Sequence, residues 1–418
     1  MLLDKKSAVQ FEKDIFGAKR YECYDELIAE HPVYWCESVN SFLISRFNDV
    51  AKCVRSDTLT TERLVVEKIE NLKDGESDFF KEIIDVISTW MIYNDKPVHT
   101  RLRKFMNRAF MKKELDAIVP EISKLTMKVI TKVKSSDKSE FDFVKDIAHP
   151  LPAMILCKML GLHEDNVDTF IKWSDDIANF MQDFVVSPIP DSDIAEVTKN
   201  SMREMFNFLH TTIKSRRKHP ENDLISRLVN NDQEASDTEA LTDAEVAAQT
   251  IHLIFGGHKI PQFMLSNTLN SLFLNPLEME RVREDNSRLY SLLEESMRYE
   301  GPIQFITRHV SKDFELHGVE LKKGDSVFLM LGAANRDKNI FKNADKFIPD
   351  REDKTHLAFG GGHHNCIGAA FVRIEMGIIF KLLINEFKLL DPLYNIEDPE
   401  WTDNPTFHGI TTMPIKVK

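Results

Sequence analysis

One cysteine lies in a setting that suits a thiolate. The stretch HLAFGGGHHNCIGAAF has three consecutive glycines and then Cys366 between His364 and Gly368. Glycines permit left-handed turns and the close approach of a flat partner, and a helix that begins directly afterwards would stabilise a thiolate with its free amides. Such a thiolate, with no second sulfur nearby, is either a nucleophile or a single axial metal ligand. No Lys-Ser/Thr pair follows, as a phosphate-binding loop would require.

Composition limits the other possibilities. The 418-residue chain has a formal net charge of -13, which argues against nucleic acid as a partner. The other four cysteines include no CxxC pair, so we expect buried thiols and neither a disulfide framework nor a zinc site: Cys23, Cys36, Cys53 and Cys157. The N-terminal residues resemble no signal peptide, and no apolar run approaches the roughly 20 residues of a membrane span. We therefore expect a cytoplasmic protein without a membrane anchor.

Periodicity predicts a mainly helical chain with a minor β component. Thr242 and Glu245 form a capping box that opens a helix to Asn275, about 50 Å long and therefore central to the fold. A second helix is expected over Asn286–Tyr299 and a last one over Ala369–Phe387. Short strands are expected in FITRHV, FELHGVEL and DSVFLML, with turns at Gly318 and Gly324, and in an early pair that turns at residues 38–40. No linker or repeat divides the chain, so residues 1–418 are expected to form one domain.

The cysteine loop resembles that of the cytochrome P450 superfamily. Its Phe359-Gly360-x-Gly362-x-His364-x-Cys366-x-Gly368 pattern matches the family's haem-binding loop at every fixed position, and the resemblance covers most of the chain. It implies a monomeric, single-domain cytochrome P450 fold, with haem b held between the long central helix and the cysteine loop and its helix. Cys366 would be the axial iron ligand. Three residues match the family's structural salt-bridge cluster: Glu295, Arg298 and Arg351.

Haem propionates need cationic or hydrogen-bonding partners. By resemblance these are His99 and Arg103, which lie one helical turn apart in DKPVHTRLR, together with Arg308 and His364. His356 is a further candidate. A histidine on a helix is commonly a structural residue, but the i, i+4 pairing inside this motif favours a cofactor contact.

A basic face is expected on the same helix. Four cationic residues recur there at helical spacing, on a different side from His99 and Arg103: Arg101, Lys104, Arg108 and Lys112. The resemblance implies electron supply from an acidic ferredoxin or flavodoxin with its reductase, and this face is a candidate docking site for it. An ordinary solvated run of charges explains the pattern equally well.

The central helix departs from the family pattern. Where the family has a small pair followed by an acid and an alcohol that relay protons, this chain has Gly256-Gly257-His258-Lys259-Ile260-Pro261. Pro261 cannot donate to the Gly257 carbonyl, so we expect the helix to open there. Protons would then come from ordered water, from His258, or from the substrate's own hydroxyl or amide.

Three functions remain compatible with these residues. The favoured one is an oxidase that uses dioxygen on a small hydrophobic secondary-metabolite intermediate; the alternatives are a non-catalytic haem auxiliary or sensor and a peroxide-using enzyme. Several stretches, among them LTTERLVVE and LGAANRD, look similar to bacterial cyclodipeptide oxidases and imply a cyclic dipeptide, peptide or polyketide substrate. By position, the resemblance assigns the substrate pocket to residues 64–90, a helix pair over 170–186, residues Gly256, Gly257 and Ile260 of the central helix, strand 303–306 and turn 406–408. The helix pair carries an apolar cluster: Phe180, Met181, Phe184, Val185 and Val186.

Overall fold

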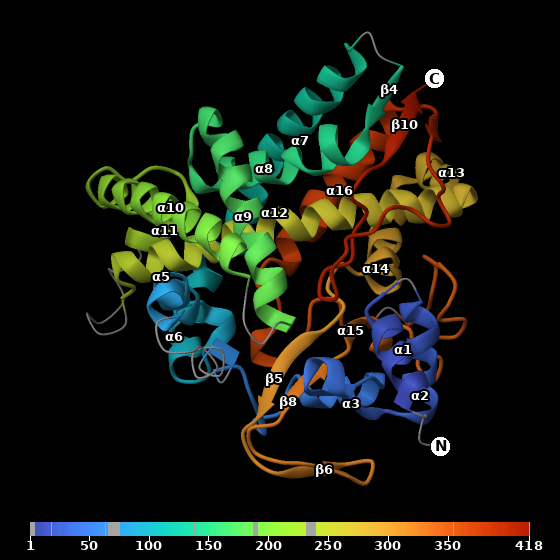
Figure 1. Ribbon diagram of the computed structural model, residues 1–418. Coiled ribbons are helices and arrows are strands. Elements are labelled where there is room, and N and C mark those ends of the chain that lie inside the picture. Colours follow the sequence, from blue (N-terminus) through green and yellow to red (C-terminus); the bar gives the residue numbers. More distant parts are fainter. Residues whose placement is uncertain are drawn as a thin grey trace.

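The apolar stretch after Thr242 forms the longest helix of the protein, α12 (Asp243–Leu274). The Thr242 side chain accepts from the Glu245 amide, and the Glu245 carboxylate accepts from the Thr242 amide at 2.9 Å, so the expected capping box is present. In the computed structural model, which describes residues 5–17, 19–62, 64–65, 76–136, 139–186, 191–230, 240–353 and 355–417, α12 crosses the width of the molecule (Figure 1). The expectation of a long central helix is confirmed.

Other helices surround α12. It contacts α8, α9, α10, α14 and α16, and the main apolar core forms where these helices meet. The α-helices are α1 (Lys5–Ile15), α2 (Arg20–Glu30), α3 (Phe47–Cys53), α5 (Glu76–Ser88), α6 (Val98–Ala109), α7 (Lys112–Lys134), α8 (Pro150–Leu160), α9 (Val167–Val186), α10 (Ser192–Lys218), α11 (Leu224–Asn230), α13 (Pro276–Glu284), α14 (Leu289–Tyr299), α15 (Leu331–Ala334) and α16 (Ala369–Glu386). Short 3-10 or π turns are η1 (Glu37–Val39), η2 (Met91–Tyr93), η3 (Val144–Ala148), η4 (Glu164–Asn166), η6 (Asn286–Arg288) and η7 (Gly362–His364).

Among the described residues, the strands form three small sheets. The largest has the strand order β1-β2-β8-β5-β3, in which β2 and β8 run parallel and the other pairs antiparallel. The strands are β1 (Val33–Cys36), β2 (Ser41–Ile44), β3 (Leu59–Thr60), β4 (Glu140–Asp142), β5 (Ile306–Val310), β6 (Phe314–Leu316), β7 (Val319–Leu321), β8 (Ser326–Leu329), β9 (Leu390–Pro392) and β10 (Pro414–Val417). The early pair and the turns at Gly318 and Gly324, both with positive φ, are as expected.

Two segments differ from the expected elements. The presumed helix pair over residues 170–186 is one continuous helix, α9, because no glycine or proline interrupts its apolar period. The helix expected from Asn286 begins with the 3-10 turn η6 and becomes α-helical at Leu289, since Asp285 caps it by accepting from the Ser287 amide. No helix among the described residues is long and apolar enough to cross a membrane.

A buried carboxylate joins α14 to the chain that precedes the cysteine loop. Glu295 accepts two hydrogen bonds of 2.8 Å from Arg298, others of 3.2 Å from Arg351, and one of 2.7 Å from the Ile348 amide. All three charged side chains are buried. The two guanidinium groups also donate to the carbonyls of Asn335, Lys342, Asn343, Ala344 and Lys346. The cluster therefore fixes the chain between α15 and the loop.

We expect Glu295→Ala to destabilise the protein by about 3–5 kcal/mol, because it leaves two buried guanidinium groups without a counter-charge. Thermal melting of the haem-loaded protein measures the loss. The matched control is Glu82→Ala, which breaks an exposed pair with Arg203 and should cost less than about 1 kcal/mol. Equal melting temperatures for the two variants would contradict a structural role for the cluster.

Candidate functional site

Glycine backbone geometry shapes the cysteine loop. Gly360 and Gly362 have φ of +68° and +65°, a region that side-chain-bearing residues rarely adopt. A Cβ at Gly362 would also lie 2.4 Å from the carbonyl oxygen of Val54. The Cys366 amide donates to the Phe359 carbonyl at 3.0 Å, which closes the loop, and α16 begins three residues later with Gly368 as its N-cap. The expected turn geometry and the helix after the cysteine are both present.

Cys366 differs from the other cysteines in its exposure. Its side chain is exposed, whereas the other four are buried. Burial by the surrounding protein raises the pKa of the Cys366 thiol, while the Gly368 amide, Arg103 and Arg373 oppose that rise. The Cys366 sulfur is therefore accessible on one side, while protein atoms surround it on the others. A coordinated metal ion would deprotonate such a thiol outright.

Helix α6 brings two predicted cofactor contacts beside this loop. Arg103 donates from Nη1 to the Asn365 carbonyl at 2.6 Å. His99 is 2% exposed, and its Nε2 atom has no hydrogen-bond partner. Its ring centroid lies 4.3 Å from that of His364, and burial, with nearby His364, lowers the pKa of His99 to about 4. His99 is therefore neutral near pH 7, with one buried nitrogen available to a ligand.

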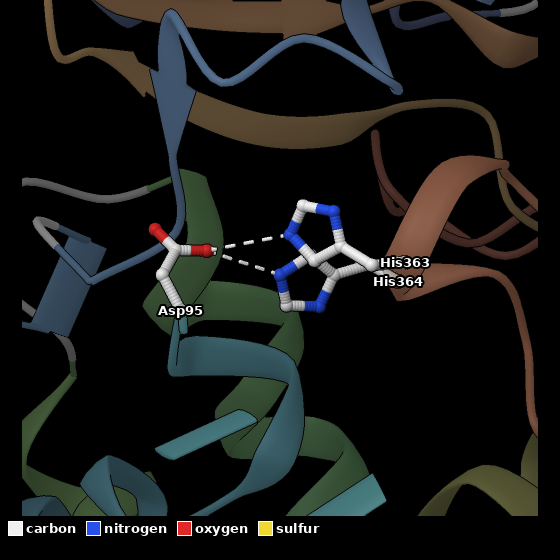
Figure 2. A group of neighbouring side chains, drawn as sticks. All are labelled: Asp95, His363 and His364. Atoms are coloured by element: carbon white, nitrogen blue, oxygen red, sulfur yellow. Dashed lines mark hydrogen bonds and ion pairs between the residues drawn. The ribbon is translucent and has the colours of Figure 1, made fainter. Parts of the chain in front are cut away.

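An aspartate that the sequence did not single out meets the loop histidines. Figure 2 shows Asp95, directly before α6, facing His363 and His364; its Oδ1 lies 3.1 Å from His364 Nε2 and 3.8 Å from His363 Nε2. Burial alone would raise the pKa of Asp95, but bonds from His364, Thr60 and the Thr61 amide hold it well below its usual range. Burial lowers the pKa of His364, so a neutral imidazole donates to the carboxylate.

The other two predicted cofactor contacts, Arg308 and His356, lie in different surroundings. Arg308 is buried, and within the described part of the chain its hydrogen bond goes to the Thr307 carbonyl rather than to a carboxylate. Burial lowers the pKa of Arg308 to about 10. His356 instead lies 3.2 Å from Glu294, which also binds Arg373. This position gives His356 no part in the cluster around His99, so its role as a cofactor contact gains no support.

The middle of α12 borders open space. Every residue from Pro261 to Leu272 is buried, but most residues between Ile251 and Pro261 keep some exposure although the helix is central. A Cβ at Gly256 would meet nothing within 4 Å, whereas one at Gly257 would lie 3.2 Å from Leu156 on α8. The two glycines therefore face different surroundings: Gly257 faces α8, and Gly256 faces the open space, which we call the hollow.

His258 is one of two polar side chains on this part of α12 that point to neighbouring helices. His258 is buried; its Nε2 lies 2.9 Å from the His149 carbonyl and its Nδ1 lies 2.9 Å from the Ser174 hydroxyl. Because a carbonyl only accepts, Nε2 carries the proton and Nδ1 accepts from Ser174. Burial, with nearby Lys259, lowers the pKa of His258 to about 3. Both nitrogens are engaged, which argues against His258 as a proton source.

Lys259 occupies the position where the family pattern has an acid, and it has an ion-pair partner. Its ammonium lies 2.7 Å from Asp175 Oδ1 on α9 and 3.1 Å from Gln262 Oε1. Asp175 also accepts from His149 Nε2 at 3.0 Å. His149, Asp175 and His258 are close enough together to suggest a cation site, but Lys259 already supplies the positive charge there.

Pro261 does not break the helix. The α-helix is continuous from Asp243 to Leu274 with Pro261 inside it, so the expected opening is wrong. The proline still removes the amide that would donate to the Gly257 carbonyl. Pro261 is buried and α12 packs against α8, α9 and α10, and such tertiary packing can override a local preference against helix.

The predicted pocket segments are only partly supported. Phe180, Met181 and Phe184 are core residues, and Val185 packs on the N-terminal apolar cluster. Residues 66–75 and the side chain of Val186 lie outside the described residues. The C-terminal turn does reach α12, because Phe407 contacts Phe255 with ring centroids 6.1 Å apart.

These features fit a haem. The hollow beside Gly256, the exposed thiol of Cys366, the unpartnered His99 Nε2 and the buried Arg308 cation meet the needs of an iron ligand site with propionate partners. The sequence motifs located these residues. They did not find Asp95 or Asp175, because Asp175 lies 84 residues from Lys259 in the chain and no local pattern links them.

Comparison with known proteins gives consistent matches. The cytochrome P450 family model matches residues 52–417. The biotin biosynthesis cytochrome P450 of Bacillus subtilis is 28% identical over 405 residues, with 94% of this chain and 95% of that protein covered. The pulcherriminic acid synthase of Bacillus subtilis is 29% identical over 388 residues, with 90% of each covered. A cytochrome P450 of Bacillus megaterium, solved in complex with corticosterone, is 26% identical with a TM-score of 0.81, covering 97% of this chain and 99% of that one.

We expect Asp175→Asn to lower stability at pH 7 by about 1 kcal/mol, because it removes the counter-charge of Lys259. Burial would raise the pKa of Asp175, but His149 and Lys259 outweigh it and hold the pKa below its usual range. The stabilisation is therefore complete above the ordinary carboxyl pKa of about 4 and declines as the pH falls below it.

Thermal melting between pH 7 and pH 3 measures this difference. The control is Asp85→Asn, which removes an exposed partner of Lys81 and should leave the melting temperature unchanged. A difference between wild type and Asp175→Asn that grows as the pH falls would contradict the assignment.

Proposed function

Because this chain belongs to the cytochrome P450 family and is a haem-dependent monooxygenase, we propose that it oxidises a small, neutral, hydrophobic intermediate of secondary metabolism. Haem, when bound, would supply dioxygen activation, and Cys366 would be its thiolate ligand. Arg103, Arg308 and His99 would hold the propionates, and His364 would do so by turning its N–H from Asp95 to a propionate. The electrons would come from a ferredoxin or flavodoxin with its reductase.

One observation carries the atypical part of this proposal. No side chain at the central turn of α12 offers a proton to the hollow: Ile260 has no hydroxyl, Lys259 is paired with Asp175, and both nitrogens of His258 are occupied. Proton delivery therefore falls to ordered water or to the substrate. The sequence had left three possible proton sources, ordered water, His258 and the substrate, and His258 is no longer one of them.

The substrate would then carry a polar hydrogen of its own. A hydroxyl or amide N–H in the hollow beside Gly256 could pass a proton that His258, Lys259 and Ile260 do not provide. A cyclic dipeptide meets this requirement, as does a peptide or polyketide intermediate. A relative named for pulcherriminic acid synthesis supports small-molecule biosynthesis as the setting.

Electron transfer would use α6, the helix that lies next to the cysteine loop. Arg103 touches the carbonyl of Asn365, so α6 adjoins the Cys366 loop. Arg101 is not part of the predicted basic face, because its guanidinium pairs with Glu245 on α12. Lys112, expected on the same helix, is instead the first residue of α7. The face on α6 therefore consists of Lys104 and Arg108, and its positive charge suits an acidic partner.

We expect Ile260→Thr to change product formed per NADPH by less than about twofold, because the relay does not depend on a hydroxyl at this position. The measurement uses the haem-loaded protein, a surrogate ferredoxin and reductase, and a cyclic dipeptide with two apolar side chains. Ile260→Val is the matched control for shape. A rise of about 100-fold with the threonine alone, the scale of an added general acid, would contradict substrate-assisted delivery.

Reversing charge with Lys104→Glu and Arg108→Glu together should slow haem reduction by an acidic ferredoxin at least about tenfold at low salt. The difference should shrink as ionic strength rises and screens the charges. Stopped-flow reduction under carbon monoxide measures the rate. The double variant Lys128→Glu and Lys132→Glu, at two exposed lysines on α7, is the control for the same change of net charge. An unchanged rate at all ionic strengths would exclude this docking face.

A further inference from the structure

His252 lies on the side of α12 that faces the hollow. It precedes Gly256 by four residues and Ile260 by eight, and residues at these spacings share one face of a helix. A Cβ at Gly256 would meet nothing within 4 Å. All three residues keep some exposure, although other helices surround α12. The face of α12 that carries them is therefore the one that borders open space.

Both ring nitrogens of His252 are accessible and unpaired. Neither forms a hydrogen bond within the part of the chain that the structure describes, and neither is among the fully buried polar atoms that lack a partner. Trp90 Nε1 and His99 Nε2, in contrast, are fully buried. Burial nevertheless lowers the pKa of His252 to about 4, so the ring lies deep in the protein. Accessible surface at such depth means that the two nitrogens border an internal space.

Trp90 fixes the plane of the imidazole. The two rings stack with centroids 4.9 Å apart and planes 12° apart. Gln249 on α12 holds the chain on both sides of Trp90, because its side chain accepts from the Met91 amide at 3.0 Å and donates to the Thr89 carbonyl at 2.5 Å. The stack covers one face of the His252 ring and leaves the edge, which carries the nitrogens, to a ligand. A polar group that is held in place before a ligand arrives suits specific recognition.

The imidazole is a polar group on an otherwise apolar face. Gly256 and Ile260 offer the hollow no side-chain donor or acceptor. Near pH 7 the His252 ring is neutral, so one nitrogen donates and the other accepts. Pockets lined mainly by apolar groups use their few polar groups to orient the ligand. A neutral hydroxyl or amide suits this ring, whereas a charged group would enter the hollow at a large desolvation cost.

We propose that His252 determines substrate specificity by accepting a hydrogen bond from the hydroxyl or amide N–H of a neutral substrate bound beside Gly256. The inference rests on the proposed function, in which the substrate brings its own polar hydrogen. It names the side chain that orients this hydrogen. A hydrocarbon of the same shape would leave the imidazole unpaired and lose that orientation.

The test uses the haem-loaded protein and two probes that differ by one hydroxyl, cyclododecanol and cyclododecane, with a cyclic dipeptide as a third. Titration of the haem spin state gives each dissociation constant. We expect His252→Phe, which keeps a flat ring and removes both nitrogens, to weaken cyclododecanol binding about tenfold and to change cyclododecane binding less than about twofold. His210→Phe, which removes an imidazole that stacks on Phe206 of α10, should change neither.

Three results would overturn the inference. Two are equal weakening of both cyclododecyl probes and no weakening of either. The third is a wild-type resting spectrum of nitrogen-ligated iron that His252→Phe abolishes, which would mean that the imidazole binds the haem iron. The thiolate-type spectrum of the reduced carbon monoxide complex shows whether each variant keeps its haem site, and His252→Leu repeats the test if the phenylalanine variant loads no haem. Failure of the cyclic dipeptide alone to bind, while cyclododecanol still responds to His252→Phe, would count against the proposed substrate and leave the role of His252 supported.

Discussion

The arrangement of the site depends on one buried carboxylate. Glu295 is the only carboxylate that the structure places within hydrogen-bond distance of both Arg298 and Arg351 among the described residues. The two guanidinium groups in turn hold a series of backbone carbonyls between residues 335 and 346. A buried charge without its partner is far more costly than an exposed one. The chain that leads to Cys366 is thus held by charge, and the packing of apolar side chains completes its position.

The central helix is under a different constraint. Its polar side chains must form their hydrogen bonds and ion pairs away from the hollow. His258 and Lys259 both reach α8 and α9 or their approaches, where a carbonyl, a hydroxyl and a carboxylate receive them. The consequence is a hollow lined at this turn by glycine and an aliphatic side chain. Its chemistry at this turn is therefore set by whatever enters it.

Local patterns predicted much of this. The capping box placed the start of α12 correctly, and the glycine spacing predicted the left-handed turns of the cysteine loop. What the sequence could not provide was pairing between distant segments, such as Lys259 with Asp175 or Asp95 with His364. The effect of Pro261 was overestimated for the same reason, because a local rule for proline takes no account of the helices packed around it.

The neighbouring glycines of α12 make unequal demands on the chain. At Gly256 a methyl group would enter open space, so this position limits the volume available to a guest molecule. At Gly257 a methyl group would press on Leu156, so that position limits how closely α8 can lie against α12. Gly256 thus controls the size of the chamber and Gly257 the spacing of its walls, although the two residues are identical and adjacent. Either quantity can vary without the other.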